Sequence, residues 1–267
     1  MGEWPSPQDL QLFHYRCLQH MYFDDLLTAT GGYLLFSDHV RDSYYNFFGA
    51  TADTSVDNVR ECEHLFLARE RTPALYVGPQ VNPEVINALT ERGYTRWATD
   101  AWLGLDLDRY FDISLPSTIV FEYLSSPGEV SYTDAFREAY SGGSDEDVYG
   151  DLDEGYTEAL SQALPTSTVN GYERRFLQAL EGNRIVGVVS LVLSDELAAC
   201  YGLGVVTNQR HRGLGRALME HIANDARSAG AKRLFLQTES GSAVEEWYRH
   251  LGYRSLFDAT YLKKPNS

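Results

Sequence analysis

Cysteine is scarce in this chain of 267 residues, and long apolar runs are missing from it. The three cysteines, Cys17, Cys62 and Cys200, are an odd number without the spacing of metal ligands. We therefore expect no metal site and no disulfide, but reduced and mostly buried thiols in a cytoplasmic protein. No apolar run approaches the roughly 20 residues that a membrane-spanning helix needs, so we expect no membrane partner.

The first residues lack the features of a targeting segment. No cationic stretch followed by an apolar stretch opens the chain, and we expect no secretory signal. Residues 1–6 fit the loose Met-Gly-x-x-x-Ser pattern of N-myristoylation, but Trp4 and Pro5 add nothing to it. We expect no lipid anchor.

Basic residues are outnumbered by acidic ones. The chain has 22 Lys and Arg against 38 Asp and Glu, a formal net charge of −16. A nucleic-acid groove needs clustered basic side chains that displace phosphate counterions, so we expect no nucleic-acid partner. The acidity is compatible with a cationic substrate, although it also serves solubility alone.

Two common nucleotide-binding motifs are absent as well. The glycine-bearing stretch 208–219 contains neither Gly-x-x-x-x-Gly-Lys-Ser/Thr nor Gly-x-Gly-x-x-Gly. It reads Arg-x-x-Gly-x-Gly instead, at Arg210, Gly213 and Gly215. A strand-like run, 197–206, precedes this loop, and a helical run, 217–228, follows it.

A strand, a glycine loop and a helix in this order favour anion binding. The first N–H groups of a helix have no partner within it, and the helix dipole adds partial positive charge there. Gly213 and Gly215 would let a phosphate approach the backbone without a Cβ in the way. The alternative is a tight strand-to-helix connection without a ligand.

The loop resembles the acyl-coenzyme A pyrophosphate loop of the GCN5-related N-acetyltransferase (GNAT) family. The resemblance continues from Gln237 to Tyr253, where residues 246–253 are similar to the family's penultimate helix and its Leu-Gly-aromatic exit. It implies an α/β (α+β) fold with a mixed, mostly antiparallel sheet flanked by helices. It also implies acetyl-CoA as cosubstrate.

The same resemblance implies the cofactor-binding residues. The pantetheine arm would pair with the backbone of Leu203 and Val205, on the edge of the strand before the loop. The carbonyl of the acyl group would then accept a backbone N–H. The pyrophosphate would bind loop N–H groups, and three arginines would add charge or would simply be solvated. The residues expected at the pyrophosphate are Arg210, His211, Arg212, Gly213, Gly215 and Arg216.

The resemblance implies one catalytic residue, Tyr248, which matches the family's tyrosine at the coenzyme A sulfur. A phenol with a pKa of about 10 is protonated at neutral pH and can donate to a thiolate leaving group. The alternative is an ordinary core tyrosine beside Trp247, because the chain has 18 tyrosines.

Two positions depart from the family's pattern. Ala199 stands where a glutamate is frequent, so deprotonation of the amine would use water or another group, with Tyr201 or Glu196 as weak candidates. Gly241 stands where an asparagine often contacts the pantetheine. That contact would fall to the backbone or to the neighbouring residues Ser240 and Ser242.

An internal repeat is indicated by Gly93-Tyr94 and Gly252-Tyr253, which stand 159 positions apart. Each pair follows a strand-like and a helical run and precedes an extended one. Shifting Arg210, Gly213 and Gly215 back by 159 gives Thr51, Thr54 and Val56, so the first half lacks the glycine loop. The alternative is two ordinary helix C-caps. We predict a degenerate GNAT-like domain at 1–115 and a catalytic one at 116–267, divided near Asp112 to Ser117.

Other segments are assigned by periodicity and turn residues. Helices are predicted at 8–27, 56–71, 83–92, 129–140, 156–164 and 243–251. Strands are predicted at 33–36, 75–77, 118–124, 173–180, 184–193, 234–236 and 254–262, with a strand pair at 97–107. Residues 181–183 predict a hairpin turn.

An acidic region without Lys or Arg lies between Arg137 and Arg174. It is either a solvated face or an electrostatic mouth for a polyamine, an aminoglycoside or a lysine side chain. Tyr140, Tyr149 and Tyr156 are interleaved with the acids and could stack against a cation. The acidic residues are Asp145, Glu146, Asp147, Asp151, Asp153, Glu154 and Glu158.

The sequence therefore predicts a tandem acyltransferase that moves an acetyl group from acetyl-CoA to a primary amine, of a small cationic molecule or of lysine. We expect direct attack in a ternary complex, because Cys200 has no partner base nearby in sequence. A non-catalytic acyl-CoA sensor is the alternative, and a nucleotide-binding α/β protein is the third. The acceptor and the oligomeric state stay open.

Overall fold

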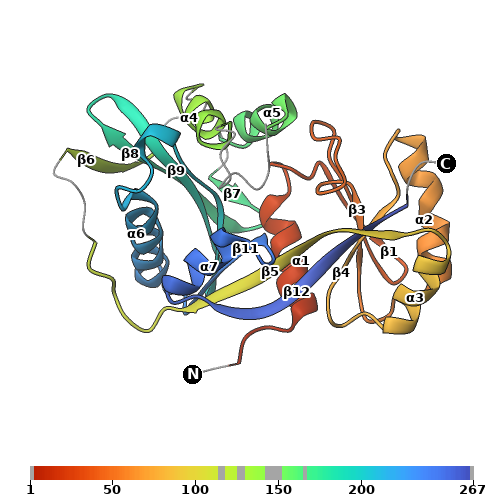
Figure 1. Ribbon diagram of the computed structural model, residues 1–267. Helices are drawn as coiled ribbons and strands as arrows, with labels where there is room; N and C mark the ends of the chain where they lie inside the picture. Colours follow the sequence, from red (N-terminus) through yellow and green to blue (C-terminus); the bar gives the residue numbers. More distant parts are fainter. Residues whose placement is uncertain (1–2, 114–117, 125–129, 142–151, 165–166, 265–267) are drawn as a thin grey trace. The chain divides into compact units, whose positions relative to one another are not determined.

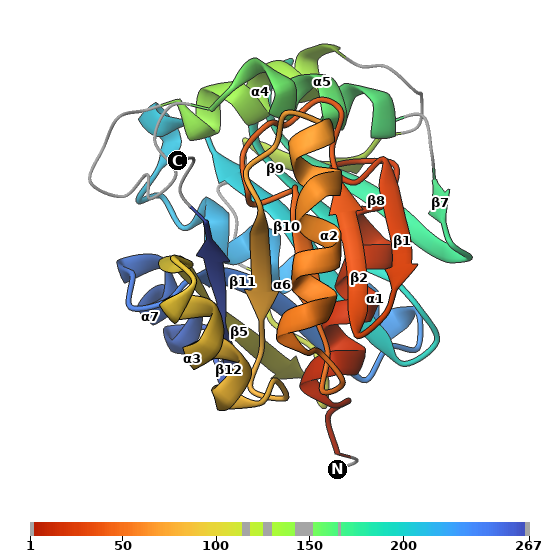
Figure 2. The same cartoon turned by 90° about the vertical axis from the view of Figure 1, so that its right-hand side faces the viewer.

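The computed structural model describes residues 3–113, 118–124, 130–141, 152–164 and 167–264 (Figures 1 and 2). The chain forms two compact units. Unit 1 consists of residues 1–102, 237–241 and 255–267, and unit 2 consists of residues 103–236 and 242–254. Strands β5 (Thr95–Asp106), β11 (Arg233–Glu239) and β12 (Arg254–Lys263) each supply residues to both units.

Unit 1 contains a sheet with the strand order β1-β2-β3-β4-β12-β5. Pairing is antiparallel from β1 to β3 and between β4 and β12, and parallel between β3 and β4. The elements not bounded above are α1 (Pro7–Leu18), β1 (Asp25–Ala29), β2 (Gly32–Phe36), β3 (Phe47–Ala50), α2 (Val56–Ala68), β4 (Ala74–Val77) and α3 (Pro83–Glu91).

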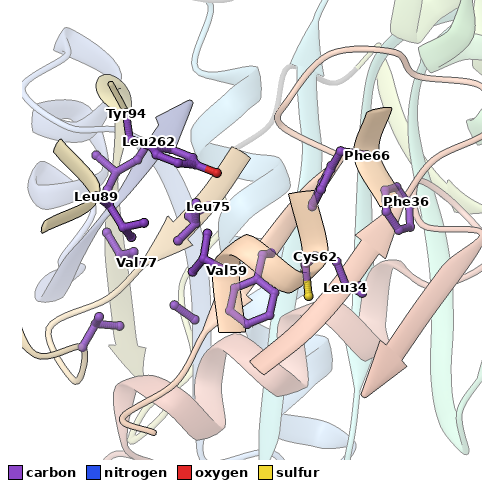
Figure 3. Close-up of a cluster of buried hydrophobic side chains, with 13 residues drawn as sticks. Leu34, Phe36, Val59, Cys62, Phe66, Leu75, Val77, Leu89, Tyr94 and Leu262 are labelled. Atoms are coloured by element: carbon purple, nitrogen blue, oxygen red, sulfur yellow. The ribbon is translucent and has the colours of Figure 1, made fainter. Parts of the chain in front are cut away.

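The strands of unit 1 alternate between two covered faces. Leu34 and Phe36 of β2 and Leu75 and Val77 of β4 face a core shared with α2 and α3 (Figure 3). The intervening Tyr76 belongs to an aromatic group on the side of α1. Because side chains alternate along a strand, apolar residues at successive positions serve both faces.

Unit 2 has the strand order β11-β10-β9-β8-β6, with β7 paired to β8. Strands β6, β8, β9 and β10 pair antiparallel, and β10 pairs parallel with β11. Helices α4 and α6 pack on β9 and β10. The elements are β6 (Ile119–Tyr123), α4 (Val130–Tyr140), α5 (Glu154–Ala163), β7 (Thr168–Val169), β8 (Tyr172–Glu181), β9 (Arg184–Leu193), β10 (Leu197–Val205), α6 (Leu214–Ser228) and α7 (Ala243–His250).

The same order of elements occurs twice along the chain. Three antiparallel strands are followed by a helix, by a strand parallel to the third, by a second helix and by a long strand. The first series runs from β1 to β5 and the second from β8 to β12. The predicted fold class, a mixed, mostly antiparallel sheet flanked by helices in two similar halves, is confirmed.

The compact units differ from the contiguous halves 1–115 and 116–267. Residues from the end of the chain complete unit 1, because β12 lies between β4 and β5 in its strand order. Of the predicted boundary, residues 114–117 lie outside the described residues. The division of the sequence at 115/116 stays a prediction.

The predicted helix 8–27 is wrong beyond Leu18. The backbone reverses at His20, whose φ is 58°, and residues 25–29 pair with β2 as a strand. Strands β3 and β7 are not predicted, and 97–107 holds one long strand, β5, rather than a pair. All three cysteines are free and buried, as expected. Within the described ranges, the helices are too short or too polar to cross a membrane.

Candidate functional site

The glycine loop connects β10 to α6 in unit 2. A short 3₁₀ turn spans Thr207–Gln209, and the chain then takes left-handed backbone angles at His211 (φ 60°) and Gly213 (φ 80°). A positive φ is strained for a residue with a Cβ, which explains the glycine at 213. These two reversals carry the chain from the end of the strand into the helix.

Helix α6 begins without a side-chain cap. Gly213 is its N-cap residue and has no side chain to accept a hydrogen bond from the first turn. The N–H groups of Leu214, Gly215 and Arg216 thus lie at the positive end of a 15-residue helix. A Cβ at Gly213 would meet no atom within 4 Å, so the space beside it is open. The arrangement suits an anion.

Arg210 braces the loop. Its Nε donates to the carbonyl of Val205 at 3.2 Å, and its Nη2 donates to the carbonyl of Ala139 at 2.7 Å. The guanidinium therefore links the loop to the end of β10 and to the end of α4. The sequence suggests a phosphate-binding charge at this position, whereas the structure gives the side chain a positioning contact.

The other two arginines are more exposed and meet acidic side chains. Arg212 forms an ion pair with Glu181 at 3.2 Å and donates to Gln209. Arg216 lies 3.6 Å from Glu220, one turn further along α6. Exposed pairs of this kind contribute little to stability, so an incoming anion could compete for both guanidinium groups. His211 is exposed beside them.

Strand β10 has an open edge before the loop. Its parallel pairing with β11 covers Leu197 to Ala199 and stops there. The N–H of Val206 donates to Val186 on β9, and extended residues alternate in direction. The backbone groups of Leu203 and Val205 therefore point away from β9. Leu203 lies within a bulge between Tyr201 and Gly204, and Val205 follows it.

Gly202 and Gly204 shape this edge. Gly202 has a φ of 60°, which the bulge uses, and a Cβ at Gly204 would come within 2.7 Å of Ala139. The approach of α4 places the hydroxyl of Tyr140 2.8 Å from the Leu203 carbonyl, to which it donates. Tyr140, which is predicted to stack against a cation, therefore also contacts the backbone of β10. Glycines inside a strand pattern were an available signal for the bulge.

Tyr248 is held at the end of α7 by a helix C-cap. Gly252 has a φ of 97°, its N–H donates to Arg249, and the N–H of Tyr253 donates to the Tyr248 carbonyl. This is a Schellman motif, in which the residue after the glycine contacts the last turn. Tyr248 is 7% exposed, and its neighbour Trp247 packs at 4.9 Å between ring centroids. The end of α3 has the same hydrogen bonds at Gly93 and Tyr94.

Three side chains considered for other roles, Glu196 for proton transfer from the amine, Ser242 for the pantetheine contact and Cys200 as a nucleophile, differ in their surroundings. Glu196 is exposed and paired with Lys232, whose hydrogen bond lowers the pKa of its carboxyl. A lowered pKa makes a carboxylate a weaker base. Ser242 accepts from the Glu245 N–H as the N-cap of α7. Cys200 is buried, and burial raises the pKa of its thiol.

The acidic region is described only in part. Asp145, Glu146, Asp147, Tyr149 and Asp151 lie outside the described residues. Asp153 is the N-cap of α5 and accepts from the Gly155 N–H at 2.8 Å. Glu154 and Glu158 are exposed. In the described part of the chain, no three His, Cys, Asp or Glu are grouped to hold a metal ion.

The equivalent loop of unit 1 satisfies its own donors. Ser55 caps α2 by accepting from the Asn58 N–H, and Asn58 accepts from the Ser55 N–H in return. Thr51 and Thr54 both donate to the carbonyl of Gly31. Strand β3 also ends one residue after its last residue paired with β4, whereas β10 continues for six residues after its last residue paired with β11. Among the described residues, the β3–α2 connection therefore has neither the uncapped helix start nor the long unpaired strand edge of the β10–α6 connection.

Comparisons with known proteins give a family match for part of the chain. Residues 133–253 match the family model described as "Acetyltransferase (GNAT) family", which covers the loop and Tyr248. No curated protein matches the sequence.

Solved structures show the same fold at low sequence identity. A GCN5-related N-acetyltransferase from Kribbella flavida is 17% identical, with a TM-score of 0.69, 96% of this chain and 95% of that chain covered. One from Sphaerobacter thermophilus is 14% identical, with a TM-score of 0.64 and coverage of 89% and 82%. A tandem GNAT protein from the clavulanic acid biosynthesis pathway is 14% identical, with a TM-score of 0.60 and coverage of 78% and 69%. Residues 133–253 therefore match the GNAT family, and the chain has the fold of these GNAT proteins.

Proposed function

We propose that the protein is an N-acetyltransferase that transfers the acetyl group of acetyl-CoA to a primary amine. The observation that carries the proposal is the uncapped start of α6 behind Gly213, next to the open edge of β10. The catalytic part would be the C-terminal half. The N-terminal half, whose equivalent helix start is capped by Ser55, would not bind the cosubstrate.

The pyrophosphate of acetyl-CoA would bind at the loop. Backbone N–H groups of residues 211–216 would donate to its oxygens, and the dipole of α6 would favour its negative charge. Arg212 and Arg216 would exchange their carboxylate partners for phosphate. Arg210 would keep the loop in register through its two carbonyl contacts.

The pantetheine arm would lie along β10. Leu203 and Val205 face the open edge, and the N–H groups there would donate to the arm and to the acyl oxygen. Each carbonyl at this edge already accepts one hydrogen bond, from Tyr140 or from Arg210, and a carbonyl oxygen has a second lone pair.

The reaction would be a direct transfer. The lone pair of the neutral amine attacks the thioester carbon, a C–N bond forms, and the C–S bond breaks. Tyr248 would give its phenolic proton to the departing sulfur, the amine would release one proton to water, and the Tyr248 phenolate would regain one proton from water. Cys200 is buried with a raised thiol pKa, which disfavours an acyl-cysteine route and supports a ternary complex.

The test is release of free thiol from acetyl-CoA with a panel of polyamines, aminoglycosides, amino acids and lysine peptides. Thermal-shift binding of acetyl-CoA is measured beside it. Thiol release with one amine class supports the transferase and names the acceptor. Stabilisation by acetyl-CoA without thiol release across the panel would favour the acyl-CoA sensor. Ala199 and Gly241, which depart from the family's pattern, are compatible with that alternative. If acetyl-CoA neither stabilises the protein nor releases thiol, both the transferase and the sensor are contradicted.

A further inference from the structure

Trp247 lies beside the glycine loop, and the proposed mechanism does not use it. It stands on α7 and is partly exposed. A Cβ built at Gly215, in the first turn of α6, would lie 3.5 Å from Cζ2 and from Cη2 of the indole and 3.8 Å from Cγ2 of Val205. The six-membered ring of Trp247 therefore packs against the backbone at the start of α6, next to the last residue of β10.

The same indole contacts Tyr248, whose ring centroid lies 4.9 Å away with the two planes at 60°. Gly215 belongs to the loop proposed for the pyrophosphate, and the Tyr248 hydroxyl is proposed to meet the sulfur. The pantetheine arm of coenzyme A is the segment that joins these two groups. Trp247, which contacts the residues proposed for both ends of the arm, therefore borders its path within unit 2.

The indole N–H of Trp247 is available to a ligand. Its Nε1 has no hydrogen-bond partner among the described residues, and it is not one of the buried unpaired atoms, so it is open to solvent. In an indole, Nε1 and Cζ2 are both bonded to Cε2. The N–H therefore lies on the same side of the ring system as the Cζ2 atom that faces α6. A tryptophan N–H usually finds an acceptor when its ring is covered.

The repeated half of the chain gives a comparison within the same molecule. Shifting Trp247 and Tyr248 back by the 159 positions between the two Gly-Tyr pairs gives Ala88 and Leu89, on α3. The start of α2 is capped by Ser55, and its connection to β3 has no long unpaired strand edge. The bulky ring is therefore present beside the uncapped helix start and is replaced by a methyl group beside the capped one.

We propose that Trp247 binds the pantetheine arm of coenzyme A, with the indole packed against the arm's methylene and methyl carbons and Nε1 donating to one of its oxygen atoms. A tryptophan suits this task, because it offers a large rigid apolar surface and one N–H donor. The arm is a flexible chain whose amide and hydroxyl oxygens can accept that hydrogen bond. The inference rests on the proposed function, since it needs the pyrophosphate at the loop and the sulfur at Tyr248.

Calorimetry on the full chain compares two ligands, coenzyme A and 3′-phosphoadenosine 5′-diphosphate, which keeps the pyrophosphate but lacks the arm. Trp247→Ala should weaken coenzyme A binding about tenfold or more, because the apolar contact is lost, and should change the affinity for the ligand without the arm less than about twofold. His250→Ala removes an exposed ring from the same helix and should leave both affinities unaltered. Equal losses for the two ligands in Trp247→Ala would mean that the indole only supports the loop, and would overturn the inference.

Tryptophan fluorescence gives a second readout, with a variant that keeps an aromatic ring. The other three tryptophans, Trp4, Trp97 and Trp102, all belong to unit 1. Coenzyme A should therefore change the emission of wild-type protein and leave that of Trp247→Phe unaltered. A change of the same size in both proteins would overturn the contact. If Trp247→Ala does not fold, Trp247→Leu replaces it in the calorimetry with the same expectation.

The outcomes separate this inference from the proposed function. Failure of coenzyme A to bind wild-type protein at millimolar concentration contradicts the proposed function itself. Coenzyme A binding of the same strength in wild type and Trp247→Ala keeps the proposed function and overturns the role of Trp247. Weaker binding of coenzyme A alone in Trp247→Ala, without thiol release from acetyl-CoA with any amine, keeps that role and contradicts the transferase.

Discussion

The ring of Tyr253 packs against the ring of Tyr248 at the end of α7, with centroids 5.6 Å apart and planes at 66°. The Tyr253 N–H donates to the carbonyl of the same tyrosine. The C-cap thus fixes Tyr248 by a backbone contact and by a side-chain contact. The Gly-Tyr sequence that follows the helix is what provides both.

Replacement of Tyr248 by Phe is expected to lower the rate of thiol release about a hundredfold or more, because the departing sulfur loses its proton donor. The affinity for acetyl-CoA should change little. The matched control is Tyr253→Phe, which removes a buried hydroxyl without a hydrogen-bond partner and should leave the rate unaltered. Equal loss of binding and rate in Tyr248→Phe would mean that this tyrosine is structural.

Gly213→Ala is expected to weaken acetyl-CoA binding about tenfold, since a strained residue shifts the N–H groups at the start of α6. Gly171→Ala serves as control. Both glycines have a φ near +80° and nothing within 4 Å of an added Cβ, so both changes cost about 1 kcal/mol of folding free energy. Calorimetric titration with acetyl-CoA measures the affinity of each variant. An equal loss of affinity in the two variants would contradict an anion site at α6.

Arg210 and Arg216 should differ in their salt dependence. Arg210→Lys loses the geometry that reaches two carbonyls, so acetyl-CoA affinity and thermal stability should fall at every ionic strength. Arg216→Gln removes an exposed charge, and its deficit should shrink towards 1 M salt, where the Debye length is about 3 Å. Matching salt profiles for the two variants would argue against a bracing role of Arg210.

Asp100 should make stability depend on pH. Its folded-state pKa of about 7 lies above the ordinary value of 3.8, so the folded state binds the proton more tightly than the unfolded state. Stability from this group is present below pH 4 and is lost as the pH rises to 7. The melting temperature of Asp100→Asn minus that of wild type should therefore be larger at pH 8 than at pH 5. A constant difference would contradict the raised pKa.

Local patterns predicted the C-terminal half of the chain well. The strand at 184–193 has the predicted bounds, because its apolar run and the turn at Gly182 are both local signals. The loop at Gly213 and the cap at Gly252 are also local, since a positive φ favours glycine whatever the tertiary contacts.

Tertiary contacts decide what the sequence did not predict. The helical pattern of 8–27 continues beyond Leu18, but residues 25–29 gain a strand partner in β2. The motif predicts that Arg210 binds phosphate. Its hydrogen bond to the carbonyl of Ala139 on α4 joins residues far apart in sequence, so the motif could not indicate it. Asp100 on β5 accepts a hydrogen bond from Tyr76 on β4 and is influenced by Glu239 on β11, which no short spacing could indicate.

The place of β12 between β4 and β5 has a consequence for biosynthesis. The strand that completes the sheet of unit 1 is made of residues 255–263, close to the end of the sequence. A ribosome that has released the first 115 residues has therefore not yet supplied a central strand of that sheet. Unit 1 can complete its sheet only after residue 263 has been translated, and residues 1–115 expressed alone would lack this strand.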